Sequence, residues 1–266
     1  MAKDELINKF NYIGTRPNRP DGLDKVTGRA KYGADFNAPN MLHAAVLRSP
    51  HAHARIIKID TSKAEALAGV KAFVTRADFP TGLKGEDFYL QENTIAGDRA
   101  LYDGHAVAAV AATSALAAKD AIKLIEVEYE ILPHVTDVDE AMRPDAPVIR
   151  KGAQDHTVPE GSPPNIVSYM DFGHGDLETG FSDADLIMEN TYKTEAAHQG
   201  YIEPHACVGQ LGQDGKGEMW ICTQGQWFIR KMCAAVLGLE ASQLRVTPSE
   251  ICLLYTSDAA DERQSV

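Results

Sequence analysis

The chain has 266 residues, of which 44% are hydrophobic and 24% are charged, a composition typical of a globular protein with a buried core. Its net charge of −12 argues against a nucleic-acid-binding surface, since the clearest basic cluster is only Arg16 to Arg19. The four cysteines form no CxxC pair, which favours buried reduced thiols over a disulfide framework or a metal site.

The chain also lacks the patterns of membrane insertion and secretion. No apolar run reaches the length of a membrane span, and the N-terminal sequence MAKDELINKF has no apolar secretory core. We therefore expect a cytoplasmic protein with no membrane span and no nucleic-acid partner. Residues 1–23 are polar, and Pro17 and Pro20 interrupt regular structure, so this segment is predicted to be an irregular arm.

From residue 25 to residue 133, strand and helix patterns alternate, which predicts one α+β or α/β layer domain. A capping box of Ser62 and Glu65 begins the first helix and Gly69 ends it, while Thr113 or Ser114 caps the second. The expected strands are 41–47, 55–59, 70–75, 106–112 and 125–132, and the expected helices are 62–68 and 114–124.

Residues 134–165 contain five prolines and are predicted to be an extended connector between domains, with one helical turn at 137–142. A second domain follows, in which Asp176 is expected to cap a short helix. Its predicted strands are 166–170, 186–194, 207–211 and 218–222, the last two forming a hairpin that turns at Asp214-Gly215.

Two groups of histidines are candidate metal ligands. His51 and His53 lie two residues apart and could face one ligand, but exposed histidines in a turn are the favoured interpretation because this spacing is a weak signal. His198, Glu203 and His205 would suit a metal-dependent hydrolase. The proline before His205 prevents a regular strand, and the spacing identifies no further ligand, so no protein-ligated metal is expected.

The stretch 219–251 holds the strongest candidate site. It is predicted to form a strand at 219–222, a polar turn at 223–226, an amphipathic helix at 227–237 that ends at Gly238, and a strand at 244–247. Gln224 therefore lies at a strand-to-helix junction, where free backbone amides and a carboxamide can face one small polar ligand.

Five phrases of the sequence, in the same order, resemble the large molybdopterin-binding subunits of molybdenum hydroxylases, the xanthine dehydrogenase and aldehyde oxidase family. They are LDKVTGRAKYGAD (23–35), LRSPHAHARI (47–56), GDLETGFSDADLIMENTY (175–192), HQGYIEPHA (198–206) and WICTQGQWFIRKMCAAVLGLEASQLRV (220–246). The resemblance implies an α+β protein, with an α/β hammerhead domain at 24–133 and the start of a molybdenum-cofactor-binding domain at 166–251.

The same resemblance implies a role for Gln224. In the family, a glutamine at the strand-to-helix turn donates a hydrogen bond to an oxo ligand of the metal, and Gln224 holds that position in Cys222-Thr223-Gln224. Gly225, the next residue of the turn, is expected to contact the cofactor with it. The pterin dithiolene holds the metal, so no protein ligand to molybdenum is expected.

The sequence departs from the family after residue 251, where a glycine-rich loop of the form GGGFGGK is expected. Residues 252–266 read CLLYTSDAADERQSV instead and are predicted to be a non-native or disordered tail, with a genuine solvated C-terminus as the alternative. The family's catalytic glutamate lies further downstream, so no catalytic residue is assigned in this chain.

The resemblance implies that the intact subunit hydroxylates or oxidises an electron-poor carbon, with water as the oxygen source. Its substrate would be a purine, an aldehyde, an aromatic acyl-CoA, carbon monoxide or a related small molecule, and electrons would leave through iron–sulfur clusters and FAD on partner subunits. The isolated fragment is expected to be inactive. The alternative is a non-catalytic binding or assembly module on the same fold, which the missing loop and glutamate favour.

Overall fold

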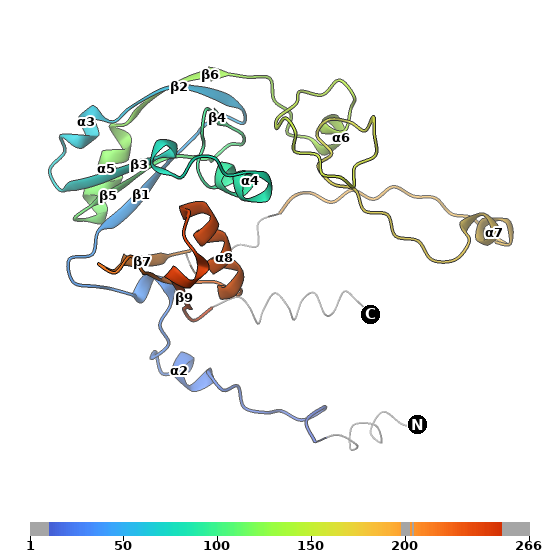
Figure 1. The fold of residues 1–266 in the computed structure, drawn as a ribbon. Helices are drawn as coiled ribbons and strands as arrows, with labels where there is room; N and C mark the ends of the chain where they lie inside the picture. The colour runs from blue at the N-terminus through green and yellow to red at the C-terminus, as the bar shows by residue number, and fades with distance from the viewer. Residues whose placement is uncertain (1–10, 198–202, 204, 252–266) are drawn as a thin grey trace. The chain divides into compact units, whose positions relative to one another are not determined.

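The computed structural model describes residues 11–197, 203 and 205–251, which divide into two compact units (Figure 1). Unit 1 contains the described parts of residues 1–38, 200–234 and 239–266, and unit 2 contains those of residues 39–199 and 235–238. The predicted tail and the first ten residues of the predicted arm lie outside the described residues.

Unit 2 is built on two antiparallel sheets, whose strand orders are β1-β5-β3 and β4-β2-β6. The centre of the first sheet is the Ala- and Val-rich strand β5, whose small side chains let a helix pack closely against it. All five strands expected between residues 25 and 133 are confirmed within two residues. The strands are β1 (His43–Arg48), β2 (Ala54–Asp60), β3 (Val70–Thr75), β4 (Arg99–Ala100), β5 (Ala106–Ala112) and β6 (Glu126–Ile131).

Helix α5 packs on the first sheet and completes the core of unit 2 (Figure 1). Its expected cap is confirmed, because Ser114 Oγ accepts a hydrogen bond from the Ala117 amide at 3.1 Å. The core consists of Ala64, Ala108, Val110, Ala121 and Ile125. The helices of unit 2 are α3 (Ser62–Glu65), η2 (Arg76–Asp78), α4 (Gly85–Thr94), α5 (Ala115–Lys123), α6 (Val138–Ala141) and α7 (Leu177–Ser182).

The capping box predicted for the first helix is wrong, although the helix is present as α3 and ends before Gly69 at a φ of 94°. Its N-cap residue is Thr61, whose hydroxyl donates to the Glu65 carboxylate at 2.5 Å. The Ser62 hydroxyl donates instead to Asp60 at 2.6 Å. An aspartate two residues earlier therefore competes successfully for the serine.

Helix α4 is absent from the sequence predictions because its inward contacts are polar and follow no apolar period. Gln91 is fully buried and donates to the carbonyl of Val236 at 3.0 Å. The carbonyl of Glu92 accepts from His105 Nε2 at 2.8 Å, and the Glu92 carboxylate pairs with Arg150 at 2.9 Å. Polar side chains therefore make the inward contacts of α4, which in most helices are made by apolar ones.

The extended conformation predicted for residues 134–165 is wrong, because the segment folds back on itself. The Asn165 carboxamide donates to the carbonyls of Ala141 at 3.2 Å and Pro147 at 3.0 Å, and it accepts from the Ile149 amide at 3.3 Å. The hydrogen bonds of the Asn165 side chain therefore hold the loop closed. The predicted helical turn is confirmed as α6, capped by Asp137.

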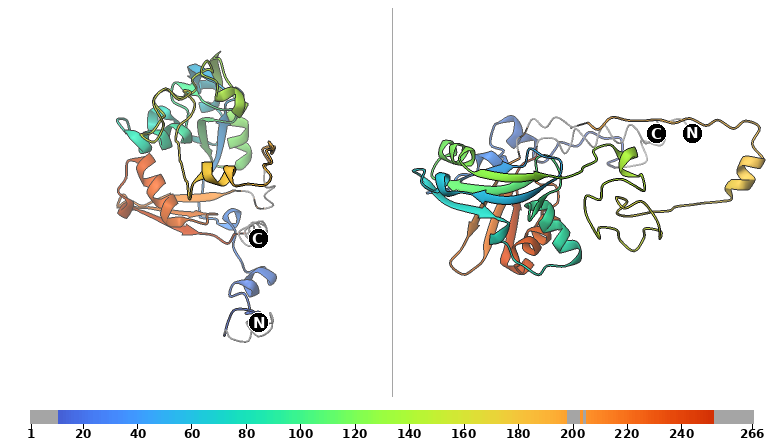
Figure 2. Two further views of the ribbon diagram at one scale, coloured as in Figure 1. Left: turned by 90° about the vertical axis from the view of Figure 1, so that its right-hand side faces the viewer. Right: turned by 90° about the horizontal axis from the view of Figure 1, so that it is seen from above.

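The strands predicted at 166–170 and 186–194 are also wrong. The described residues there form an extended run that carries α7 (Figure 2), whose expected Asp176 cap is confirmed at 3.1 and 3.3 Å from two amides. An alternating pattern forms a strand only where another strand pairs with it. Within the described residues, no strand pairs with this run.

Unit 1 is a three-stranded sheet of order β7-β8-β9 with one helix between its last two strands. The predicted hairpin is confirmed, with Gly215 in its turn at a φ of 76°. β8 and β9 are parallel, and Gly238 ends the connecting helix at a φ of 66°, as expected. The elements are β7 (Cys207–Leu211), β8 (Gly217–Ile221), α8 (Gln226–Leu237), η3 (Ala241–Gln243) and β9 (Leu244–Pro248). The last turn of α8, from residue 235, groups with unit 2.

The segment 21–36 belongs to unit 1 and contains α2 (Gly22–Val26) and η1 (Gly33–Asp35). It lies close to the strand β7, because a Cβ at Gly33 would come within 2.7 Å of the Ala206 carbonyl oxygen. The rings of Phe36 and Trp220 stack with centroids 6.2 Å apart. An N-terminal segment is thus built into a sheet formed more than 170 residues later.

Candidate functional site

The candidate site lies at the carboxyl ends of β8 and β9. These strands are parallel neighbours, with Ile221 opposite Pro248, so the residues that follow them meet at one edge of the sheet. A hydrogen bond of 2.9 Å from the Ser249 amide to the Ile221 carbonyl joins the two strand ends. In open sheets with parallel strands, ligands bind in this place.

A cavity of about 360 Å³ opens at this edge, within the size range of small-molecule sites. Three elements contribute: the loop between β8 and α8, the residues after β9, and helix α2. Most of the lining side chains are polar or charged, which suits a ligand with several hydrogen-bonding groups. The lining residues are Asp21, Lys25, Thr223, Gln224, Gln226, Pro248, Ser249, Glu250 and Ile251.

Gln224 lies between β8 and the start of α8, as the sequence predicts, and its exposed side chain lines the cavity. Among the described residues, none forms a hydrogen bond with its carboxamide. The two donors and the acceptor of this side chain are therefore available to a ligand.

Gly225 is arranged differently. Its amide donates to Thr223 Oγ1 at 3.1 Å, and its carbonyl accepts from the Ile229 amide at 2.9 Å. A Cβ at this position would meet only the Cβ of Phe228, at an ordinary 3.7 Å. The backbone of Gly225 thus stabilises the turn, and nothing in the surrounding chain requires a glycine there.

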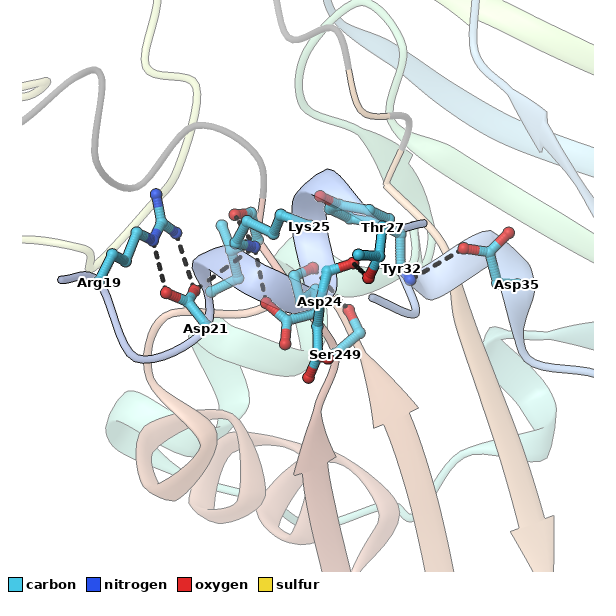
Figure 3. Close-up of polar contacts among 10 residues, drawn as sticks. Arg19, Asp21, Asp24, Lys25, Thr27, Tyr32, Asp35 and Ser249 are labelled. Carbon is cyan, nitrogen blue, oxygen red and sulfur yellow. Dashed lines mark hydrogen bonds and ion pairs between the residues drawn. The ribbon is translucent and has the colours of Figure 1, made fainter. Parts of the chain in front are cut away.

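Four charged side chains of alternating sign, Arg19, Asp21, Lys25 and Glu250, form a row of ion pairs, and all of them except Arg19 line the cavity. Figure 3 shows the contacts among Arg19, Asp21 and Lys25. Arg19 donates to Asp21 through two hydrogen bonds of 2.5 and 2.8 Å. Lys25 Nζ lies 3.6 Å from Asp21 and 2.6 Å from Glu250, and it also donates to the Ile251 carbonyl at 3.4 Å. At neutral pH these four charges sum to zero.

These ion pairs and hydrogen bonds shift the pKa values of Asp21 and Lys25. The hydrogen bonds from Arg19 lower the pKa of Asp21 to about 2. Burial alone would lower the pKa of Lys25, but the hydrogen bond to Glu250 and the negative charges of Glu250 and Asp21 outweigh burial and raise it. Both groups are therefore charged throughout the physiological range.

His51 and His53, considered together as metal ligands, make separate contacts. His53 is buried, and its Nδ1 donates to the Pro133 carbonyl at 2.7 Å, so the expectation of an exposed side chain is wrong for His53. His51 packs edge-on against the Tyr129 ring at a centroid distance of 5.0 Å. Across the described ranges, no group of three or more His, Cys, Asp or Glu side chains is placed to hold a metal ion, and His198 lies outside them.

The described cysteines are unbridged. Cys207, Cys222 and Cys233 are free thiols, and Cys252 lies outside the described residues. Partial burial raises the pKa of the Cys233 thiol, which keeps it protonated at neutral pH, whereas Cys207 is exposed, so the prediction of a buried thiol is wrong for Cys207. Of the helices that the structure describes, none is both long and apolar enough to cross a membrane.

Sequence reasoning missed Asp21, Lys25 and Glu250 as cavity-lining residues. Lys25 and Glu250 are 225 positions apart, and no local period or motif connects them. The phrase at 23–35 contains three positively charged residues, Lys25, Arg29 and Lys31, and nothing in it singles out Lys25 or indicates its partner.

Two protein-family models match the chain. Residues 27–133 match the aldehyde oxidase and xanthine dehydrogenase a/b hammerhead domain, and residues 158–251 match the molybdopterin cofactor-binding domain. The expected order of a hammerhead domain followed by the start of a cofactor-binding domain is confirmed.

Curated relatives and solved structures agree with these matches. The chain is 34% identical to a probable xanthine dehydrogenase subunit from Bacillus subtilis (strain 168), over 92% of this chain and 31% of that protein. It is 30% identical to the nicotinate dehydrogenase large molybdopterin subunit of Eubacterium barkeri, over 92% of this chain and 54% of that protein. The crystal structure of quinoline 2-oxidoreductase from Pseudomonas putida 86 superposes with a TM-score of 0.72 at 28% identity, over 89% of this chain and 30% of that chain.

The chain thus spans about a third to a half of the length of these relatives. Both of its matched regions belong to one kind of protein, and the sheets and helices described above superpose on a solved member of it. The chain belongs to the xanthine dehydrogenase and aldehyde oxidase family of molybdenum hydroxylase large subunits.

Proposed function

We propose that this chain supplies the hammerhead domain, at 24–133, and the first part of the cofactor-binding domain, at 166–251, of a subunit that binds the molybdenum–molybdopterin cofactor. The family models at 27–133 and 158–251 support this division. The observation that carries the proposal is the Gln224 carboxamide, which lines a polar cavity and has no hydrogen-bond partner among the described residues.

The residues around the cavity fit such a group. Its volume of about 360 Å³ admits part of a small organic ligand, and its walls offer hydroxyl, amide and charged groups. The first amides of α8 have no carbonyl partner within the helix, and the positive end of the helix dipole favours an anionic or electron-rich ligand atom there. Gln224 lies two residues before the first residue of α8.

When bound, the molybdenum cofactor supplies two-electron oxidation and transfer of a water-derived oxygen. Gln224 would hold the cofactor through a hydrogen bond from Nε2, and Gly225 would keep the turn in place with its amide on Thr223. A carboxamide neither gains nor loses a proton in the physiological range, so Gln224 orients its partner without exchanging a proton with it. Proton removal needs a base, and we assign none in this chain.

For the whole subunit we propose oxidation or hydroxylation of an electron-poor carbon in a small molecule, with water as the oxygen source. Iron–sulfur and FAD subunits would accept the electrons. The names of two relatives, a xanthine and a nicotinate dehydrogenase, favour substrates of the aromatic nitrogen heterocycle class. The segment 1–266 alone would be inactive, because it carries the cofactor-facing glutamine without a base.

The proposal is tested by comparing this chain with the subunit expressed from the uninterrupted gene of its source genome. The longer subunit should contain molybdenum and pterin and reduce an electron-accepting dye, and the 266-residue chain should not turn over. Turnover by the chain alone would refute the assignment. A source reading frame that stops after residue 266, with no molybdenum in the purified protein, would favour a non-catalytic assembly module instead.

Substitution of Gln224 in the longer subunit tests the residue itself. Gln224→Met keeps the side-chain length but removes the donor, and we expect a loss of about a hundredfold in kcat, the scale of losing one preorganised donor. Gln213→Met is the matched control, because Gln213 is exposed in the β7–β8 turn and does not line the cavity. Equal kcat values for the two variants would remove Gln224 from the site.

A further inference from the structure

Lys25 makes more polar contacts than the other lysines of unit 1 that the structure describes. Its Nζ donates to the Glu250 carboxylate at 2.6 Å and to the Ile251 carbonyl at 3.4 Å. The same atom lies 3.6 Å from Asp21 and 5.3 Å from the centre of the Tyr32 ring. Only 17% of the side chain is exposed, so these contacts are partly shielded from water.

These contacts fix the chain that leaves β9. The Glu250 amide donates to the Lys31 carbonyl at 3.0 Å, so the segment around α2 holds Glu250 by both its backbone and its side chain. One residue earlier, the Ser249 amide binds the Ile221 carbonyl at the end of β8. Lys25 is thereby connected, through residues 249–250, to the strand that leads into the Gln224 loop.

A neighbouring ion pair provides an internal comparison. Arg29 and Asp24 lie in the same segment and pair at 2.9 Å, but 62% and 53% of their side chains are exposed. Neither residue lines the cavity. An exposed pair of this kind contributes little to stability, whereas removal of one partner of a shielded pair leaves a charge without compensation.

We propose that Lys25 is a positioning residue of the cavity that Gln224 lines. It fixes Glu250 and Ile251, and so the wall of the cavity that residues 249–251 form after β9. It touches the wall and not the reacting atoms. The inference rests on the proposed function for the identity of the ligand, whereas the positioning of the wall can be measured without any ligand. The segment around α2, near the N-terminus of the chain, therefore helps to shape the cavity of unit 1.

The test compares three variants of the 266-residue chain by hydrogen exchange and thermal unfolding. Lys25→Met should speed exchange of the Ser249 and Glu250 amides about tenfold, because it leaves Glu250 without its ion pair and lowers the free energy of local opening. Exchange across β7 and β8 should not change to a matching extent. Lys25→Arg should restore slow exchange, and Arg29→Met should leave both amides as in the wild type.

Several results would overturn the proposal. Exchange at Ser249 and Glu250 that is equal in Lys25→Met and Arg29→Met would do so, as would a uniform increase throughout the sheet, which indicates general stability. If Lys25→Met does not fold, Glu250→Gln removes the charge at the other end of the contact and should give the same local increase in exchange.

A second measurement separates this inference from the proposed function. In the subunit expressed from the uninterrupted gene, Lys25→Met should lower retained molybdopterin, measured as its fluorescent oxidation product, by about tenfold relative to Arg29→Met. Retention equal in the two variants would overturn the role of Lys25 at the site. A wild-type subunit without pterin would refute the proposed function, and the exchange measurement would still decide whether Lys25 fixes the wall.

Discussion

Replacing His105 by Phe should destabilise unit 2 strongly. The His105 side chain is fully buried and stacks on the Tyr102 ring at a centroid distance of 4.3 Å. Its Nδ1 accepts from the Leu101 amide at 3.1 Å, and its Nε2 donates to the Glu92 carbonyl at 2.8 Å. Both ring nitrogens are therefore used, and the acceptor role of Nδ1 fixes the neutral tautomer with the proton on Nε2.

The size of the effect follows from these two bonds. Phe keeps a planar aromatic ring for the stacking, and its larger ring at this fully buried position can only add to the loss. It leaves the Leu101 amide and the Glu92 carbonyl without a partner, at about 1–3 kcal/mol for each buried group. We expect a total loss of about 2–6 kcal/mol in the free energy of unfolding of unit 2 from these two groups, a large fraction of the stability of a domain.

Hydrogen exchange of the β5 amides in a urea series measures this loss, because β5 is the central strand of its sheet. His134→Phe is the control, since His134 is exposed. If His105→Phe stays within about 0.5 kcal/mol of the control, the polar contacts of His105 do not stabilise unit 2 and the reasoning is wrong.

The same histidine predicts the pH dependence of unit 2. Burial lowers the pKa of His105 below that of a free histidine, which is about 6.5. As the pH falls below about 6.5, the unfolded chain therefore binds a proton that the folded chain does not, and the free energy of unfolding decreases until the folded pKa is reached. His105→Phe should remove this part of the pH dependence, and an unchanged slope between pH 6.5 and pH 5 would contradict the assignment.

Two further substitutions test the packing of each unit. Gly33→Ala places a Cβ about 2.7 Å from the Ala206 carbonyl oxygen and should destabilise unit 1 by about 1–3 kcal/mol, whereas Gly209→Ala, with open space around its Cβ, should cost less than 1 kcal/mol in thermal unfolding. Gln91→Leu removes the buried hydrogen bond to the Val236 carbonyl and should lower the free energy of unfolding, measured in urea, by about 1–3 kcal/mol. Gln213→Leu, in an exposed turn, should change it little, and equal losses for the two variants would contradict the role of Gln91.

The sequence was sufficient to predict the elements that position the site because their signals are local. The turn at Asp214-Gly215 pairs β7 with β8, and the apolar period of 227–237 specifies a helix that Gly238 ends in a left-handed conformation. With β9 following, these signals place Gln224 at a strand-to-helix junction without any long-range information.

The rest of the cavity could not be predicted, because long-range polar contacts form it. Lys25 reaches Glu250 across 225 positions. Helix α4, which is not part of the cavity, was missed for a similar reason, because its inward face carries Gln91 in place of an apolar side chain. The two strands predicted at 166–170 and 186–194 failed for a related reason. Alternation predicts which face of a strand is apolar, but a strand exists only when its backbone finds a partner.

The most direct test of the account is the structure of the cofactor-loaded subunit, expressed from the uninterrupted gene. We predict electron density for the pterin and molybdenum at the carboxyl ends of β8 and β9, with Gln224 Nε2 about 2.7–3.2 Å from an acceptor atom of the cofactor. Density for the cofactor at another edge of the sheet, or a Gln224 side chain turned away from it, would contradict the central claim.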